Sequence, residues 1–517
     1  MFPSEMQDPN PKYLEDEAEK PLTKTDLEDQ THGIDHSEKP NVFFSSFLEP
    51  FQWLHMLCSR LNPTFVLGVV LVYGINQGFS GSFFKVVSDY YWKDVQKVQP
   101  SAVQLFIGLY YIPWVMKPIW GLMTDVFPIK GYRRRPYFVL AGVVGMVSAS
   151  MVAAGGQLAV VVALVCLIGI TAGVAIADVT IDACIARNSI EFKSLAADMQ
   201  SLCGFCSSAG ALMGYSTSGF FVHHLGPQGS LGILAIPPAA LIVLGFVIYE
   251  LRTNDDIHVE KKKSKEKLKE AVHGMYKTIQ FPQVWKPSLY MYLSLALSIS
   301  THEGQFYWYT DPEAGPAFSQ EFVGVIYAIG AMASIVGVII YHKTLKDYPF
   351  RTLIFFAQLL YGLSGMLDLV FIMRWNLALG IPDYFFVVLE ECVARVISRI
   401  RWMPMMVLSS QLCPLGIEGT FFALLMCIDS LGSLTSKWSG GMILHLFHVT
   451  RTDFKNLWVT VLIRNLLRIL TLGLIFLVPN ADSSEVLIPP NVLARSNDYD
   501  MVDDSLQMVP LNQKTQV

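Results

Sequence analysis

Several ionisable residues lie within long apolar segments of this chain, where an unpaired charge is costly. Asp178 and Asp182 are one helical turn apart, and Glu391, Arg395 and Arg399 repeat at four-residue spacing. Such spacing places side chains on one face of a helix, so the second set predicts a polar stripe that can neutralise itself and bind an anion. Charges are kept in apolar segments mainly where a cavity or a partner needs them, so all five residues are candidate functional residues.

Buried carboxyl groups can also carry protons. A carboxyl group in a partly dry cavity can hold a proton near neutral pH, and Asp178 and Glu303 are our candidates for this role. Lys117 adds a cation to the second apolar segment. The alternative for such charges is a static network of ion pairs between helices, which we favour for the last apolar segment. The pairs expected there join Arg464 or Arg468 to Asp429 or Asp368.

A basic loop between two apolar segments predicts a conformational gate. Gly121 is expected to allow close approach of helices, and Asp125 lies where a membrane helix leaves the bilayer. Arg133, Arg134 and Arg135 can bridge this carboxylate and the C-termini of helices, and so lock one conformation. The alternative is that these arginines only set the topology, because cytoplasmic loops are generally basic.

The elements that position these residues are predicted to be membrane-spanning helices. Of the 517 residues, 52% are hydrophobic and only 16% are charged, and the mean hydropathy is +0.41. The apolar segments are long and do not alternate, which indicates an all-α membrane protein and excludes a barrel. We expect twelve spans, near 64–84, 101–123, 136–155, 158–181, 199–221, 231–250, 287–307, 319–341, 352–373, 383–407, 418–439 and 457–479.

The spans divide into two groups of six on either side of a Lys-rich segment. This arrangement is typical of the major facilitator type, in which the substrate binds near the midplane between two halves. Basic residues concentrate in the loops that share a side with both termini, which predicts cytoplasmic termini. The predicted divisions are a disordered tail with an interfacial segment (1–60), a first half (61–250), a linker (251–286), a second half (287–480) and a second disordered tail (481–517).

The sequence offers no motif for an enzyme, a metal site or a cofactor. It has no H-E-x-x-H, no phosphate-binding glycine loop and no G-x-S-x-G. Cys203 and Cys206 form a C-x-x-C without a second pair of ligands, so we interpret them as packing residues. The partners we expect are a small-molecule substrate, a coupling proton and the lipid bilayer, with no nucleic acid.

Five signatures together resemble those of a known family. They are Lys117-Pro118, Trp120-Gly121 with Thr124-Asp125, Tyr132 to Pro136, Asp178 to Ala183 and Leu412 to Thr420. Across residues 60–480 the chain resembles the folate-biopterin transporter family of the major facilitator superfamily, most closely its plant members. The resemblance implies twelve helices, a central cavity and proton-driven transport of folates or pterins.

The implied substrates suggest roles for both signs of charge. A pterin offers hydrogen-bond donors to a carboxylate, and the glutamate carboxylates of a folate favour Arg or Lys. Asp178 or Asp182 together with Arg395 or Arg399 would then form a pair of sites. The alternatives are a carrier of another anionic or zwitterionic solute on the same scaffold, and a receptor that binds a ligand without moving it.

The first 40 residues bear on the choice of membrane. They are acidic, with Glu15, Asp16, Glu17 and Glu19 close together, whereas transit peptides are poor in acidic residues. Some members of the family reach plastids through such a peptide. We therefore expect the plasma membrane or an internal membrane rather than the plastid envelope.

Overall fold

The computed structural model describes residues 52–127, 129–192, 195–250, 279–345, 348–411 and 418–480. The chain separates into two compact units, Met1–Arg60 and Leu61–Val517, and the fold below is that of the second unit. Its described regular structure is helical, apart from one bridge between Ile129 and Tyr132. We use "first half" for residues 61–250 and "second half" for residues 279–480. The tail segments 1–51 and 481–517 and most of the predicted linker lie outside the described residues.

The first half begins with one long helical stretch. Its parts are α2 (Pro63–Val69), the π-helical η1 (Val70–Phe79), α3 (Ser80–Tyr90) and the π-helical η2 (Tyr91–Val95). The predicted second span is a broken helix of three pieces, α4 (Pro100–Leu109), α5 (Ile112–Val115) and α6 (Lys117–Val126). The remaining helices are α7 (Arg135–Ala154), α8 (Val160–Glu191), α9 (Ala196–Ile233) and α10 (Ile236–Val247).

The second half begins with a helix that is interrupted just before His302 and Glu303. Residues 297–301 separate α12 (Pro282–Ala296) from α13 (His302–Tyr309). The other elements are α14 (Gln320–Ile340), η4 (Tyr341–Leu345), α15 (Phe350–Ile372), α16 (Trp375–Ala378), α17 (Asp383–Gln411), α18 (Glu418–Leu446), α19 (Leu457–Leu470) and η5 (Thr471–Leu477). Helix breaks at membrane depth leave backbone groups free to bind a ligand or a neighbouring helix.

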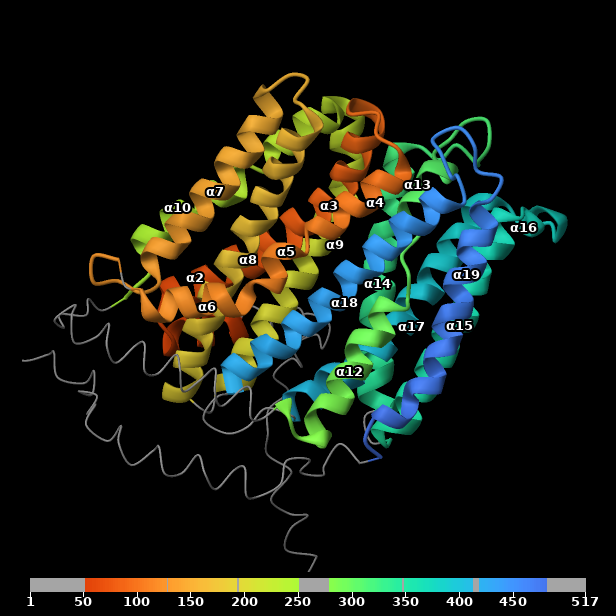
Figure 1. Ribbon diagram of the computed structural model, residues 1–517. Coiled ribbons are helices and arrows are strands. Elements are labelled where there is room, and N and C mark those ends of the chain that lie inside the picture. The colour runs from red at the N-terminus through yellow and green to blue at the C-terminus, as the bar shows by residue number, and fades with distance from the viewer. Residues whose placement is uncertain are drawn as a thin grey trace, which may run out of the picture. The chain divides into compact units, whose positions relative to one another are not determined.

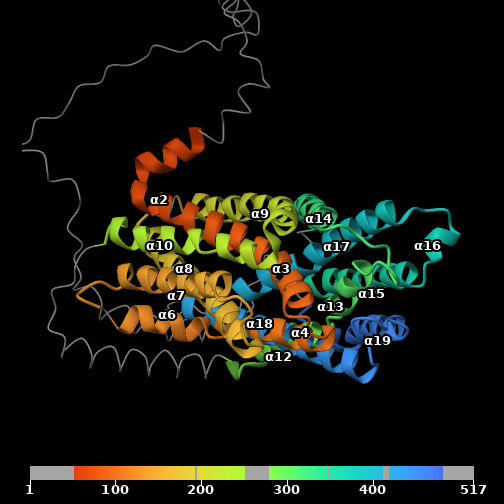
Figure 2. The ribbon, with the colours of Figure 1, turned by 90° about the horizontal axis from the view of Figure 1, so that it is seen from above.

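Within this unit the helices of the first half lie beside those of the second half (Figure 1), and the view from above agrees (Figure 2). The halves contact each other through α9 with α14, through α18 with α4, α5 and α6, and through α13 with α4. Gly210 and Gly214 of α9 form a G-x-x-x-G that permits close packing, because a Cβ atom at Gly214 would lie 2.5 Å from the carbonyl oxygen of Phe79. Helix α9 therefore contacts the backbone of the first helical stretch directly.

Seven described helical stretches are long and apolar enough to cross a membrane. Other predicted spans miss this criterion for visible reasons. The second and seventh are broken into short helices, and α17 carries Glu390, Glu391, Arg395, Arg399 and Arg401. The chain is a helical multi-pass membrane protein, and the count of twelve spans stays a prediction.

The first predicted span needs a correction at its end. We expected it to end near residue 84, but the helix continues through Val95. The continuation places Lys85 and Asp89 on a helix inside the bundle, beyond the end that we expected for this span. Asp89 is buried, with a side chain that is 2% exposed.

Candidate functional site

Lys117 and Asp178 form an ion pair between two helices of the first half. The Nζ atom of Lys117, at the start of α6, lies 2.5 Å from Oδ2 of Asp178 on α8. The Lys117 side chain is 17% exposed and that of Asp178 is 2% exposed. The ammonium group also lies 4.8 Å from the centroid of the Trp114 ring. The sequence predicted both residues separately, and the structure brings them together.

Asp182 is one turn further along α8 but has a different environment. Its side chain is exposed, and its Oδ1 accepts a hydrogen bond from the hydroxyl of Tyr73 on η1. An exposed carboxylate in the middle of an apolar bundle faces a space that solvent or a solute can reach. Asp178 and Asp182 are therefore not equivalent, because Asp178 pairs with a cation and Asp182 accepts a hydrogen bond from a hydroxyl.

The predicted polar stripe on α17 forms, with one internal ion pair. Nε of Arg395 lies 2.6 Å from Oε1 of Glu391, one turn away. Arg399 instead donates from Nε to the hydroxyl of Ser334 on α14, at 2.9 Å. The expectation that the stripe neutralises part of its own charge is confirmed by the Glu391–Arg395 pair.

A cavity of about 110 Å³ lies in the second half and reaches α3 of the first half. Glu391 and Arg395 line it, whereas Lys117, Asp178 and Asp182 do not. Its polar and aromatic lining consists of Lys85, His302, Gln305, Trp308, Tyr309, Tyr327, Asp368, Phe371, Glu390, Glu391 and Arg395. The cavity thus combines three carboxyl groups, two cations and several rings within a small volume.

The static ion pair expected on the last span is present on one side of this cavity. Arg464 on α19 donates to the carboxylate of Asp368 on α15, and its side chain is 5% exposed. Gln305 of α13 donates to the other oxygen of Asp368 at 2.9 Å and accepts from Arg464 at 3.0 Å. Arg464 is therefore held by three helices, as a structural ion pair requires.

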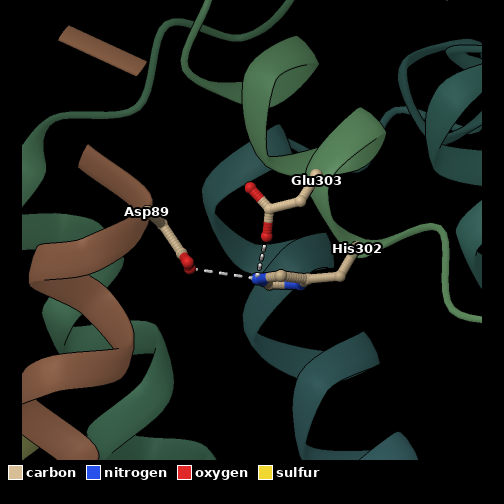
Figure 3. A group of neighbouring side chains, drawn as sticks. All are labelled: Asp89, His302 and Glu303. Atoms are coloured by element: carbon tan, nitrogen blue, oxygen red, sulfur yellow. Dashed lines mark hydrogen bonds and ion pairs between the residues drawn. The ribbon is translucent and has the colours of Figure 1, made fainter. Parts of the chain in front are cut away.

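Glu303 lies beside two residues that the sequence interpretation missed (Figure 3). Nε2 of His302 lies 3.8 Å from Oε1 of Glu303 and 3.2 Å from Oδ2 of Asp89. The Glu303 side chain is fully buried, and its backbone N–H donates to the side chain of Gln104 on α4. Lys85 and Asp89 are four residues apart and share one face of α3. This spacing is present in the sequence, but both residues lie beyond residue 84, where we expected the first span to end.

These groups belong to a wider contact between the halves at one end of the bundle. Among pairs in which both partners are described, every hydrogen bond or ion pair that joins the halves lies toward the loops at 96–99, 310–319 and 447–456. Besides the contacts above, they are Lys93 with Thr310, Tyr307 with Val98, Arg451 with Gln99, Gln104 with Ser300 and His223 with Glu321.

The predicted gate loop lies at the opposite end of the first half. Glu250, which the sequence did not single out, accepts the backbone N–H groups of Arg133, Arg134 and Arg135 at 2.7 to 3.1 Å. A carboxylate there neutralises the positive N-terminus of α7.

The arginine side chains of this loop also bind helix ends. Arg134 donates to the hydroxyl of Thr124 at 2.6 Å, and Arg135 donates to the carbonyl oxygen of Ile248, just after α10, at 2.8 Å.

The predictions for Asp125 and Gly121 have different outcomes. The prediction for Asp125 is not tested, because its side chain lies outside the described residues. A Cβ atom at Gly121 would be 3.5 Å from Val179, an ordinary contact, so a close approach of helices at Gly121 is not required.

Comparison with known proteins places the chain in a family. The model of the BT1 family matches residues 77–488. The chain is 66% identical to "Probable folate-biopterin transporter 6" of Arabidopsis thaliana, over 89% of this chain and 93% of the relative. It is 30% identical to the "Folate-biopterin transporter" of Synechocystis sp., over 90% of each.

The fold is of the major facilitator type. The solved structure of the nucleoside transporter NupG superposes with a TM-score of 0.60 at 12% identity, and covers 80% of this chain and 99% of that one. At this identity the likeness concerns the fold alone. On the family match and the two sequence identities, the chain belongs to the BT1 family and is a multi-pass membrane transporter, not an enzyme.

Proposed function

We propose that this protein is a secondary active transporter that carries folates or pterins across a membrane in symport with protons. The names of its relatives support the substrate class. In the same proposal, twelve spans form two halves of six, with both termini in the cytoplasm. The basic loop at Lys130–Arg135 would then face the cytoplasm, in agreement with the positive-inside rule.

The cavity beside α13 and α17 is the observation that carries this proposal. A pterin is flat, donates hydrogen bonds from its ring nitrogens, and in folates is joined to glutamate carboxylates. Glu390 and Glu391 offer acceptors for the ring, and Lys85 and Arg395 offer cations for the carboxylates. Tyr327 offers a stacking surface, and the ammonium of Lys85 already lies 4.5 Å from the centroid of its ring.

The aromatic run at residues 306–309 supports a role in stacking for two of its members. Trp308 and Tyr309 line the cavity, but Trp308 is also buried in the hydrophobic core with Phe306 and Tyr307. Such a run can stack on a flat ligand or lie in an interfacial aromatic belt. The geometry favours stacking for Tyr309, the more exposed of the two cavity residues.

Alternating access is supported by the uneven contact between the halves. Hydrogen bonds join them at the end of the bundle that carries Lys93 and Thr310, and Asp182 is exposed nearer the other end. A carrier that is closed on one side and accessible from the other has this pattern. The gate role of Gly121, Asp125 and Arg133 to Arg135 belongs to the same proposal.

A second candidate is a carrier of another anionic or zwitterionic solute on the same scaffold. The ion pairs Lys117–Asp178 and Glu391–Arg395 favour it, because a zwitterion can exchange partners with such a pair. The two candidate functions differ in which solutes should compete with the transported substrate for the cavity: pterins for the first, and other anions or zwitterions for the second.

The decisive experiment measures uptake of labelled folate and labelled biopterin by proteoliposomes that contain the purified protein. We expect accumulation only with an imposed proton gradient, and competition by other pterins. A panel of amino acids and organic anions serves as the comparison. Uptake of none of the pterins by folded protein would refute the substrate class, and gradient-independent accumulation would refute proton symport. Binding without uptake would indicate a receptor.

A further inference from the structure

A cluster of three ionisable groups spans the contact between the two halves. Asp89 comes from α3 in the first half, and His302 and Glu303 begin α13 in the second half, 213 residues away from Asp89. Figure 3 shows the imidazole of His302 between the two carboxyl groups, with one ring nitrogen facing both. Any change in charge here alters the attraction between the halves themselves.

Glu303 lacks the hydrogen bonds that a buried carboxylate needs. Its side chain is fully buried, and among the described residues neither of its oxygens accepts a hydrogen bond. The imidazole nitrogen of His302, at 3.8 Å, is beyond hydrogen-bond distance. A carboxyl group in such a place is far less costly when it is neutral, so it is suited to take up a proton.

The surrounding charges come from several helices. Lys85 and Asp89 contribute from α3 and Lys437 from α18, while Arg464 of α19 is already engaged with Asp368 and Thr301. The neighbouring neutral groups that can ionise are Tyr90, Tyr110, Tyr307, Tyr309 and Tyr327. Two lysines therefore balance two carboxylates, and one additional proton changes the net charge of the cluster.

His302 connects this cluster to the cavity. Its side chain is 24% exposed, it lines the cavity, and Tyr327 lies within 3.3 Å of its Nε2. Imidazole exchanges protons readily near neutral pH. A proton can thus pass from water in the cavity to His302 and on to Glu303, and no other bond changes.

We propose that Asp89, His302 and Glu303 bind the transported proton, and that the bound proton holds the two halves together at this end. With the proton present, an N–H or O–H group lies between the carboxyl groups and can bridge them. After release of the proton into the cavity, two carboxylates from opposite halves face a neutral ring, and the group that bridged the halves is lost. Opening at this end then follows. The inference rests on the proposed proton symport.

A divalent cation is the competing occupant. The three ligand atoms lie within 4.8 Å of one another, which is compatible with a metal ion. The lysines at 85 and 437 disfavour it, because two ammonium groups beside a divalent cation are repelled. We therefore assign the proton.

The test separates coupling from transport. Glu303→Gln keeps the shape of the side chain but cannot release a proton, and Glu313→Gln is the matched control, since Glu313 is an exposed carboxylate in the loop after α13. In proteoliposomes we expect Glu303→Gln to lose gradient-driven accumulation at least tenfold, while exchange of labelled for unlabelled substrate without a gradient stays within twofold. The control should retain both. Wild-type accumulation by Glu303→Gln would overturn the assignment.

A second measurement does not depend on the substrate. Infrared difference spectra of the purified protein between acidic and alkaline pH should contain the C=O stretch of a buried, protonated carboxylic acid. This band should vanish in Glu303→Gln and persist in Glu313→Gln. If it persists in Glu303→Gln, or if stoichiometric Zn²⁺ binding is abolished by Asp89→Asn, the proton assignment is wrong. If wild-type protein transports neither folate nor biopterin but shows the band, the proposed substrate fails and the proton site stands.

Discussion

The Lys117–Asp178 ion pair allows structural and functional roles of Asp178 to be separated by a double-mutant cycle. Lys117→Met leaves a carboxylate that is only 2% exposed without its cation, with Asp182 one turn away. Removal of one partner of a buried pair costs about 3–5 kcal/mol. Asp178→Asn should cost less, about 3 kcal/mol, because Lys117 is 17% exposed and retains Trp114.

The double variant should recover most of this loss. With both charges removed, no uncompensated charge stays buried, and replacement of a buried ion pair is often nearly neutral, so we expect about 1 kcal/mol of destabilisation. The coupling free energy of the pair would then be at least about 5 kcal/mol. It can be measured by unfolding in mixed detergent micelles with tryptophan fluorescence, since Trp114 and Trp120 flank Lys117 in the sequence.

Uptake by the same three variants completes the experiment. If the proton site is at Glu303, the double variant should accumulate substrate in response to a proton gradient, even though each single variant is impaired. If the losses of stability in the two single variants add up in the double variant, loss of the ion pair does not explain the destabilisation. Restored stability without restored accumulation would show that Asp178 itself takes part in coupling.

Three further predictions concern other parts of the fold. Glu250→Ala should destabilise the protein by about 2 kcal/mol, because the N-terminus of α7 loses a charged acceptor; Glu250→Gln should lose about half of that, by the same unfolding assay. Arg134→Ala should lower the maximal rate of uptake with little change in substrate affinity, and a variant that loses binding instead would contradict the gate. Gly214→Val should cost about 3 kcal/mol, because its side chain meets backbone atoms of the neighbouring helix; a folded yield equal to that of wild type in size-exclusion chromatography would contradict this packing.

The positions of helices and the contents of their polar faces could be read from the sequence because they depend on neighbours within a few turns. Apolar length indicated where helices form, and four-residue spacing predicted the Glu391–Arg395 pair. The end of the first span was misjudged because Lys85 and Asp89 look like the start of a polar loop. In the folded chain other helices cover them, and burial by distant segments is invisible to a local window.

The class of protein, the family signatures and most of the intramembrane charges follow from the order of residues alone. Helix packing determines which charges meet: Lys117 with Asp178, Arg464 with Asp368, and Asp89 with His302 and Glu303. The free-energy cost of a buried charge depends on its local surroundings in the chain, whereas the compensating interaction depends on partners that distant helices bring close. A charged residue in an apolar segment can be recognised from the sequence, but its partner can be identified only in the folded structure.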